Sequence, residues 1–155
     1  SDVEEAFRTF EGLAHRMSLV AEIDGVRWID DSKGTNVDAT RKSLDGCPDA
    51  RVILILGGKD KGGDFRRLRD VIERKVRCLI TIGSAAPVIE EQLQGAAEIV
   101  RAETLSHAVE LADERARDGD LVLLSPACAS FDQYRNFEER GDHFISLVKG
   151  LEENR

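Results

Sequence analysis

Three strand-like runs in this sequence each end in a short polar loop that leads toward a predicted helix. The runs cover residues 27–30, 51–56 and 121–124, and the loops that follow them cover 31–36, 57–64 and 125–130. Short apolar runs of this kind are typical of strands buried in a parallel sheet. Because parallel strands end at the same edge of a sheet, we expect the loops to lie together where open α/β sheets bind ligands. Their Ser, Thr, Lys and Gly residues indicate an anionic ligand.

The rest of the chain alternates strands with helices. Residues 18–24 and 26–30 meet at Asp24 and Gly25, a pair that favours the tight turn of a β-hairpin. Two more strands are predicted, at 77–82 and 98–101. Helices are predicted over 3–13, from Asn36 to near Gly46, after Asp64, around Pro87, from Thr104 to near Gly119, and from about 130 to 149. This order predicts a three-layer, Rossmann-like α/β sandwich whose mostly parallel sheet has about six strands and one antiparallel N-terminal hairpin.

Composition narrows the class of partner. The 155 residues suit a single domain, and the net charge of −8 opposes nonspecific attraction to nucleic acid, so a small-molecule ligand is expected. No run approaches the roughly 18 apolar residues that span a bilayer, and the first residues lack the pattern of a signal peptide. We therefore expect no membrane partner, a cytoplasmic location and a monomer.

The cysteines and histidines carry no motif of their own. Cys47, Cys78 and Cys128 are odd in number and widely spaced, which favours buried thiols over disulfides or a zinc site. His15 is isolated and is expected to be a hydrogen-bonded surface residue, as is expected for His107 and His143.

The glycine-rich loop at 57–63 fits neither common phosphate-loop pattern. One interpretation is that its glycines only permit a tight turn. The other is that Lys59 and Lys61, at the ligand edge of the sheet, bind a carboxylate or a phosphate while glycine lets the backbone approach that anion.

The loop at 31–36 has two compatible interpretations. Its Asp, Ser, Thr and Asn residues are typical of a helix start, where their side chains accept from free N–H groups. Alternatively, Lys33 and Thr35 bind an anion at the positive end of the helix, while Asp31 accepts from a ribose hydroxyl or an amine. Arg16, just before the first strand, has the planar donors that suit phosphate.

Together, residues 10–17, 30–36, 57–63 and 125–141 resemble, in order and in spacing, the motifs of the C-terminal domain of the Mur ligases. The likeness covers nearly the whole chain. The Ser-Pro-Ala-Cys-Ala-Ser segment at 125–130 is its most specific part, and it points to the family member that adds D-glutamate over those that add alanine, diamino acids or dipeptides.

The resemblance implies roles for individual residues. Thr35 and Lys61 would hold the side-chain carboxylate of D-glutamate, and the loop register decides between Lys59 and Lys61. Ser130 and the backbone N–H of Phe137 would hold the α-carboxylate. The resemblance assigns no certain catalytic residue and no metal ligand to this domain.

The nucleotide side follows from the same resemblance. Arg16 and Asp31 correspond to family positions that reach ATP, and Lys33 lies beside them. In the family reaction, ATP converts the carboxylate of UDP-N-acetylmuramoyl-L-alanine into an acyl phosphate, and the amine of D-glutamate attacks it to give an amide, ADP and phosphate. The phosphate loop, the Mg²⁺ ligands and the UDP-sugar site belong to upstream domains in this family.

Two expectations and two alternatives follow. Residues 1–14 are expected to be the end of an upstream linker helix, and 15–155 a C-terminal domain that folds alone without ligase activity and closes about a hinge near Ala14, His15 and Arg16. The first alternative is another Mur-type or folylpolyglutamate-type ligase domain, although the segment 125–141 argues against the folylpolyglutamate type. The second is a stand-alone α/β small-molecule-binding module with no enzymatic role.

Overall fold

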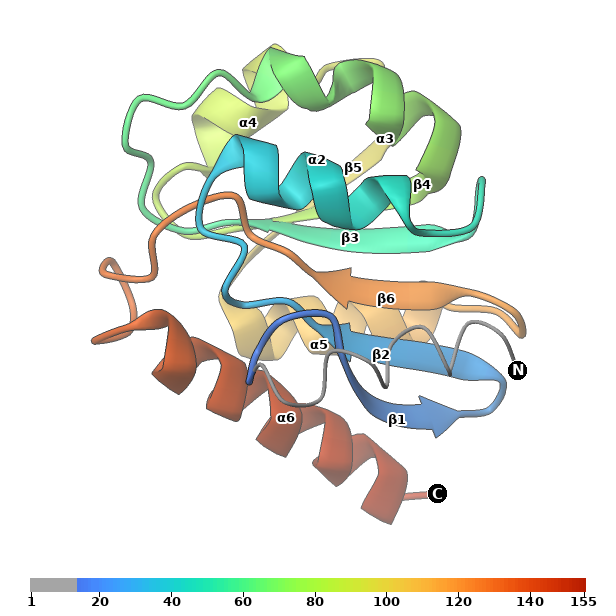
Figure 1. The fold of residues 1–155 in the computed structure, drawn as a ribbon. Coiled ribbons are helices and arrows are strands. Elements are labelled where there is room, and N and C mark those ends of the chain that lie inside the picture. The colour runs from blue at the N-terminus through green and yellow to red at the C-terminus, as the bar shows by residue number, and fades with distance from the viewer. Residues whose placement is uncertain (1–13) are drawn as a thin grey trace.

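The computed structural model describes residues 14–155 (Figure 1). Within them, one sheet has the strand order β1-β2-β6-β3-β4-β5, and β1 is antiparallel to β2 while the other neighbours are parallel. The strands are β1 (Ser18–Ile23), β2 (Val26–Asp30), β3 (Val52–Gly57), β4 (Val76–Ile82), β5 (Glu98–Glu103) and β6 (Leu121–Leu124). This confirms the predicted sheet and its N-terminal hairpin. The helix predicted over residues 3–13 lies outside the described residues.

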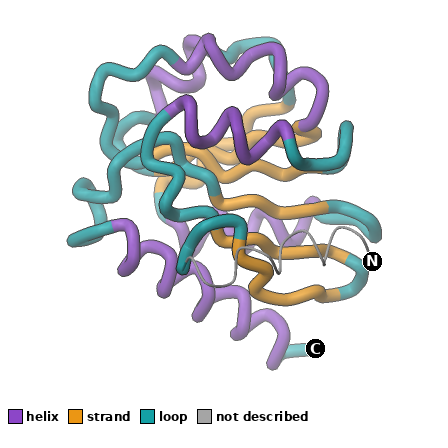
Figure 2. The backbone as a smooth tube through the Cα atoms, in the orientation of Figure 1, coloured by secondary structure: helices purple, strands orange, loops and turns teal. Residues whose placement is uncertain are grey.

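Helices cover both faces of the sheet, which makes three layers (Figures 1 and 2). One face carries α2 (Val37–Asp45), the 3₁₀ turn η1 (Phe65–Leu68), α3 (Arg69–Lys75) and α4 (Ala86–Gln92), and the other carries α5 (Leu105–Arg115) and α6 (Phe137–Glu153). No helix among residues 14–155 is long and apolar enough to cross a membrane.

The central strand β3 explains the apolar run at 51–56. Successive side chains of a strand point to opposite faces. Leu54 and Leu56 therefore pack with α2 and α3, whereas Ile53 and Ile55 pack with α5 and α6, and all four are fully buried. Each such burial contributes about 1.5–3 kcal/mol. The three cysteines are also buried and unpaired, as predicted.

The hairpin turn follows the prediction at Asp24 and Gly25. Both residues have positive φ angles, of 52° and 77°. Two successive left-handed residues give the turn whose twist matches that of two antiparallel strands. The turn therefore fixes the first two strands next to each other.

The predicted helix ends needed correction in four places, one of which is the end of the last helix, at Glu153 rather than near Lys149. The last helix begins at Phe137 rather than near Ser130, because Asn136 caps it by accepting from the N–H of Glu139 at 2.8 Å. Helix α5 ends at Arg115, before Gly119. The segment after Asp64 begins as a 3₁₀ turn before it continues as α3.

Candidate functional site

The ends of β2, β6 and β3 lie side by side, as predicted. In the parallel register, Asp30 pairs with Leu124, and Leu124 pairs with Ile55. The polar loops after these strands therefore start at the same edge of the sheet.

Backbone hydrogen bonds tie these three loops together. The N–H of Ala127 donates to the carbonyl of Gly34 at 2.8 Å, and the N–H of Gly57 donates to the carbonyl of Pro126 at 2.9 Å. The N–H of Lys59 donates to the carbonyl of Ala129 at 2.8 Å, which forms an isolated β-bridge. These backbone bonds place the loop after β6 between the other two.

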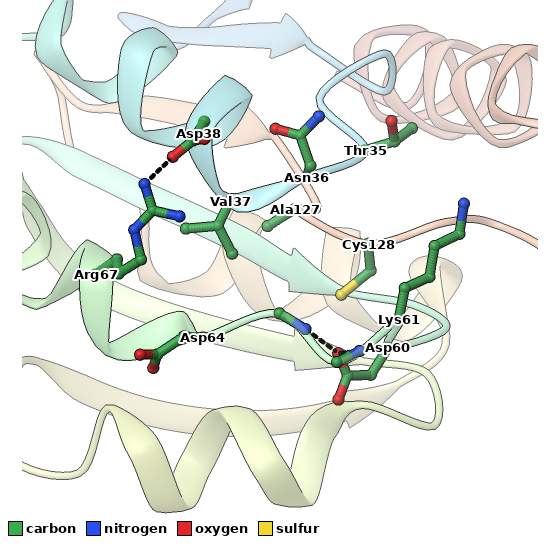
Figure 3. A pocket seen from close by; sticks show the side chains of 12 residues that line it. Thr35, Asn36, Val37, Asp38, Asp60, Lys61, Asp64, Arg67, Ala127 and Cys128 are labelled. Atoms are coloured by element: carbon green, nitrogen blue, oxygen red, sulfur yellow. Dashed lines mark hydrogen bonds and ion pairs between the residues drawn. The ribbon is translucent and has the colours of Figure 1, made fainter.

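A pocket of about 420 Å³ opens between these loops (Figure 3). Thr35 lines it from the loop after β2, Lys61 from the loop after β3, and Ala127 and Cys128 from the loop after β6. In Figure 3 the Lys61 side chain rises from its loop in the direction of Thr35. The structure thus brings together the two residues expected to hold the side-chain carboxylate of an amino acid.

The register also distinguishes the two candidate lysines. The backbone of Lys59 is held in the bridge to Ala129, and its exposed side chain does not line the pocket. Lys61, two residues further on, does line it. The geometry therefore favours Lys61.

The pocket wall contains three carboxylates, and each already has a partner. Asp38 accepts from Arg67, as Figure 3 shows, and Asp64 pairs with Arg66 at 2.8 Å. Asp60 accepts from two N–H groups of its own loop, at 2.9 and 3.1 Å. Two cationic side chains line the pocket, and one of them, Arg67, is paired with Asp38. Lys61 makes no ion pair among residues 14–155, so its ammonium can bind an incoming anion. The positive N-terminal end of α2, which also lines the pocket, favours the same charge.

Gly58 is required where the loop after β3 leaves the sheet. Its φ angle is 139°, and a Cβ at this position would lie 2.4 Å from the carbonyl oxygen of Ala129. A residue with a side chain would push apart the loops that form the pocket.

Ser130 and Phe137 lie outside the lining of this pocket. Ser130 is buried, with 2% of its surface exposed, and within the described part of the chain its hydroxyl has no hydrogen-bond partner. Phe137 is the first residue of α6, where backbone N–H groups lack acceptors inside the helix. Both groups can therefore donate to an anion, but they do not line the pocket that contains Thr35 and Lys61.

Sequence reasoning missed Arg140, a buried residue that bonds to the loops around the pocket without lining it. It is 1% exposed, and it donates to the Ser32 hydroxyl at 2.9 Å, to the Ser32 carbonyl at 2.8 Å and to the Cys128 carbonyl at 3.1 Å. The Ser32 hydroxyl in turn donates to the carbonyl of Phe137 at 2.7 Å. Burial lowers the pKa of Arg140 to about 10. This guanidinium joins the loops after β2 and β6 to the start of α6. Nothing in the sequence of the polar segment 125–141 indicated that this arginine is buried.

Asp31 lies beneath the loop rather than on its surface. Its carboxylate accepts from the Ser43 hydroxyl at 2.6 Å, the Ser125 hydroxyl at 2.7 Å and the N–H of Met17 at 3.1 Å. Only 2% of the residue is exposed, and burial raises the pKa of its carboxyl above the ordinary value. The structure therefore gives Asp31 a loop-holding role, and its contact with ATP stays a prediction.

Arg16 and Lys33 are both exposed and lie on adjoining stretches of backbone. The N–H of Lys33 donates to the carbonyl of His15 at 3.0 Å, which sets the two cationic residues close in the fold. Among the described residues neither side chain has a hydrogen-bond or ion-pair partner. Both are therefore available to an anionic ligand.

The expectation that His15 lies on the surface is wrong. The residue is 8% exposed, and its Nδ1 lies 2.6 Å from Asp30 Oδ2 while its Nε2 lies 3.3 Å from Asp142 Oδ1. The Phe137 ring meets it edge to face. His15 thus fixes the chain before β1 against both β2 and α6. His107 is exposed beside Glu110, and the partly buried His143 bonds to the Tyr134 hydroxyl at 2.6 Å.

No three or more His, Cys, Asp or Glu side chains within residues 14–155 gather in a way that could hold a metal ion. The polar groups at the described site that can donate hydrogen bonds to an anion are those of Lys61, Thr35, Ser130 and the backbone N–H groups.

An open, mostly parallel α/β sheet with helices on both faces defines a Rossmann-like domain, and the pocket lies at the carboxyl ends of its strands, where folds of this class bind small ligands. Comparison with known proteins narrows this class. Residues 15–128 match the family described as "Mur ligase, glutamate ligase domain", so the chain belongs to the Mur ligase family.

Several curated relatives carry the name UDP-N-acetylmuramoylalanine--D-glutamate ligase. The one from Desulfatibacillum aliphaticivorans is 48% identical over 149 residues, which cover 96% of this chain and 33% of the relative. The one from Syntrophotalea carbinolica is 51% identical over 145 residues, which cover 94% of this chain and 32% of the relative. The chain therefore spans about a third of the length of the curated relatives it matches.

A solved structure supports the fold independently. A murein peptide ligase from Psychrobacter arcticus superposes with a TM-score of 0.63, over 87% of this chain and 30% of that one, at 14% sequence identity. At this identity the likeness concerns the fold alone.

Proposed function

We propose that this chain is the amino-acid-binding C-terminal domain of an ATP-dependent ligase that joins D-glutamate to UDP-N-acetylmuramoyl-L-alanine during peptidoglycan precursor synthesis in the bacterial cytoplasm. The observation that carries this proposal is the Lys61 ammonium, which makes no ion pair within residues 14–155 and lines a pocket together with Thr35 in a chain of the Mur ligase family. The names of the relatives supply the amino acid, D-glutamate.

In this proposal the two carboxylates of D-glutamate have separate partners. Lys61 and Thr35 hold the side-chain carboxylate in the pocket. Ser130 and the N–H of Phe137 hold the α-carboxylate, and Arg140 keeps that end of α6 in place through Ser32. A substrate held at both ends presents its amine in one fixed direction, which is the positioning that amide formation requires.

The nucleotide side of the domain contributes charge. Arg16 and Lys33 are exposed cations that suit the phosphates of ATP. The buried carboxylate of Asp31 fixes the loop that carries Lys33 through its bonds to Met17 and Ser125. The bound amine then attacks the acyl phosphate formed from ATP and the carboxylate of the muramoyl substrate, and phosphate leaves. This domain positions the nucleophile and does not itself break the bond to phosphate.

Mg²⁺ and the UDP-sugar belong elsewhere in this proposal. The described residues offer no cluster of metal ligands, so no step is assigned to a metal held by this domain. The rest of a longer protein, of which residues 1–14 would be the linker, supplies the ATPase machinery and the UDP-sugar site, and the two parts act as a monomer.

The test is a titration of this chain with D-glutamate, with L-glutamate as the control, followed by backbone amide NMR. Wild type is expected to show shifts at Thr35, Lys61 and Ser130 for the D-isomer. Lys61→Ala and Ser130→Ala are each expected to weaken binding about 10- to 100-fold, because each removes a hydrogen bond to a charged group.

Lys59→Ala is the matched control, since it removes the neighbouring lysine that does not line the pocket. Its affinity should equal that of wild type. Equal binding of both isomers, or a loss caused by Lys59→Ala as large as that caused by Lys61→Ala, would contradict the proposed site. Ligase turnover by the 155-residue chain alone would contradict the proposed division of labour.

A further inference from the structure

Phe131 is an unusual residue for its position. Within residues 14–155 it is the one large hydrophobic residue that is exposed, with 60% of its surface accessible. It directly follows Ser130, and its ring lies under the Lys61 ammonium, with Nζ 5.8 Å from the ring centroid. An exposed phenylalanine contributes little to a core, so its place between two proposed substrate contacts calls for another explanation.

The backbone on either side of Phe131 is held firmly. The Asp132 carboxylate accepts from the N–H of Ser84 at 3.0 Å, and the Gln133 side chain donates to the carbonyl of Glu103 at 2.9 Å. The carbonyl of Ser130 accepts from the backbone N–H groups of Gln133 and Tyr134, at 3.1 and 2.8 Å. The ring is therefore presented from a fixed segment.

The loop that carries Lys61 is tied to the same segment. The bridge between Lys59 and Ala129 joins the two stretches two residues before Lys61 and two residues before Phe131. Beyond the bridge, however, the lysine stem has four rotatable bonds, and fixing such a side chain costs up to about 2 kcal/mol of rotamer entropy. A contact that restrains the ammonium before substrate arrives reduces this cost at binding.

We propose that Phe131 is a positioning residue that holds the Lys61 ammonium in place for the substrate carboxylate. The inference rests on the proposed function and adds to it a specific residue for the amino-acid site. The ring occupies one side of the ammonium and leaves N–H donors on its other sides for a carboxylate. An aromatic face attracts a cation, whereas an aliphatic side chain of similar size does not. The ring therefore restrains Lys61 without neutralising it.

The contact itself is tested first in this chain without any substrate. The ring current of Phe131 should shift the proton resonances of the Lys61 side chain upfield, and Phe131→Leu should abolish the shift while the backbone spectrum elsewhere stays unchanged. A Lys61 spectrum that is identical in wild type and Phe131→Leu would overturn the proposal.

The functional test uses the complete ligase that carries this domain. Phe131→Leu should raise the KM for D-glutamate about two- to fivefold, the size of an exposed cation–π contact, with kcat and the KM for ATP unchanged. Phe131→Tyr, which keeps an aromatic face, should restore the wild-type KM.

A double-mutant cycle identifies the residue through which Phe131 acts. In a Lys61→Met background, Phe131→Leu should cause no further rise in KM, because the ammonium that the ring positions is gone. An equal rise in both backgrounds would show that Phe131 acts independently of Lys61. Absence of D-glutamate-dependent turnover in the wild-type enzyme would instead refute the proposed function, so the two failures are distinguishable.

Discussion

Cys128 lines the pocket, yet its environment keeps the thiol protonated. Burial raises its pKa to about 12, and it raises the pKa of Cys47 to about 12 and that of Cys78 to about 11. The thiolate is the reactive form of cysteine, so none of these groups should act as a nucleophile at neutral pH. Cys128 is therefore part of the pocket wall and not of its chemistry.

The corresponding prediction concerns thiol reactivity. At pH 8 a disulfide reagent such as DTNB should modify none of the three cysteines in the folded chain, and all three at once after unfolding in urea. The absorbance of the released thiolate measures both. Rapid modification of one thiol in the native chain would mean that the site around it opens on the timescale of the reaction.

Gly58 is the residue on which the pocket most directly depends. Gly58→Ala should destabilise the fold by about 1–3 kcal/mol, because a Cβ would meet the Ala129 carbonyl and a positive φ angle strains a residue with a side chain. Urea unfolding measures this loss. Gly62→Ala is the control: its φ angle is also positive, at 83°, but nothing lies within 4 Å of the added Cβ. If both variants lost the same stability, backbone strain alone would explain Gly58.

At the scale of elements, α6 contains two glycines with opposite surroundings. A Cβ on Gly141 would lie 2.2 Å from His15 Nδ1, whereas a Cβ on Gly150 would meet nothing within 4 Å. Gly141→Ala should therefore destabilise the chain by about 1–3 kcal/mol, because it displaces the buried ring of His15. Gly150→Ala should stabilise it by up to about 1 kcal/mol, since alanine favours a helix interior. Thermal and urea unfolding of the two variants measure the difference.

The contact between Gly141 and His15 predicts where the effect of Gly141→Ala appears. In the NMR spectrum of this variant, resonances should change at His15 and at Asp30, whose carboxylate lies 2.6 Å from His15 Nδ1. A stable Gly141→Ala variant with an unchanged His15 resonance would mean that the ring does not occupy this position against α6.

The elements were predictable where one strong local signal decided them. The buried runs at 51–56 and 121–124 gave strands, and Asp24 with Gly25 gave the hairpin turn. The start of α6 was placed too early because the segment after Ser130 first forms a turn, held by contacts with Ser84 and Glu103 far away in the chain, before Asn136 caps the helix. A periodic pattern cannot contain such contacts.

The site divides in the same way. Family resemblance pointed to Thr35 and Lys61, and the fold unites them in one pocket. Arg140 was missed because its role comes from bonds to Ser32, 108 residues away in the sequence. His15 was misjudged because nothing next to it in the sequence shows that Asp30 and Asp142 meet its ring.

At the scale of the whole molecule, the folded chain changes the pKa of many carboxyl groups in one direction. Among residues 14–155, six carboxyl groups have pKa values below the ordinary range, each chiefly because a lysine or arginine side chain donates to it: Asp49, Asp64, Asp70, Glu90, Glu98 and Glu139. Burial moves the pKa of Asp31 the other way. The balance sets how stability depends on pH.

The sign follows from linkage. A carboxyl whose pKa is lowered by folding contributes stability above its unfolded pKa, 3.8 for Asp and 4.5 for Glu, and loses it as pH falls through the folded value. The free energy of unfolding should therefore change little between pH 7 and pH 5 and should fall below about pH 4.5. Urea titrations across this range measure it. Because these ion pairs are largely exposed, about 1 M KCl should flatten the acid loss.

Asp31 supplies the internal control for this prediction. Since folding raises its pKa, its contribution is fully present below pH 3.8 and is lost as pH rises through the raised folded value. The stability of wild type relative to Asp31→Asn should therefore shrink as pH rises from about 4 toward 7, opposite to the trend of the chain as a whole. A gap that widens with pH would mean that the hydroxyls of Ser43 and Ser125 stabilise the charged carboxylate by more than burial destabilises it. The loop beneath the proposed nucleotide side would then be held by a buried charge rather than by neutral hydrogen bonds.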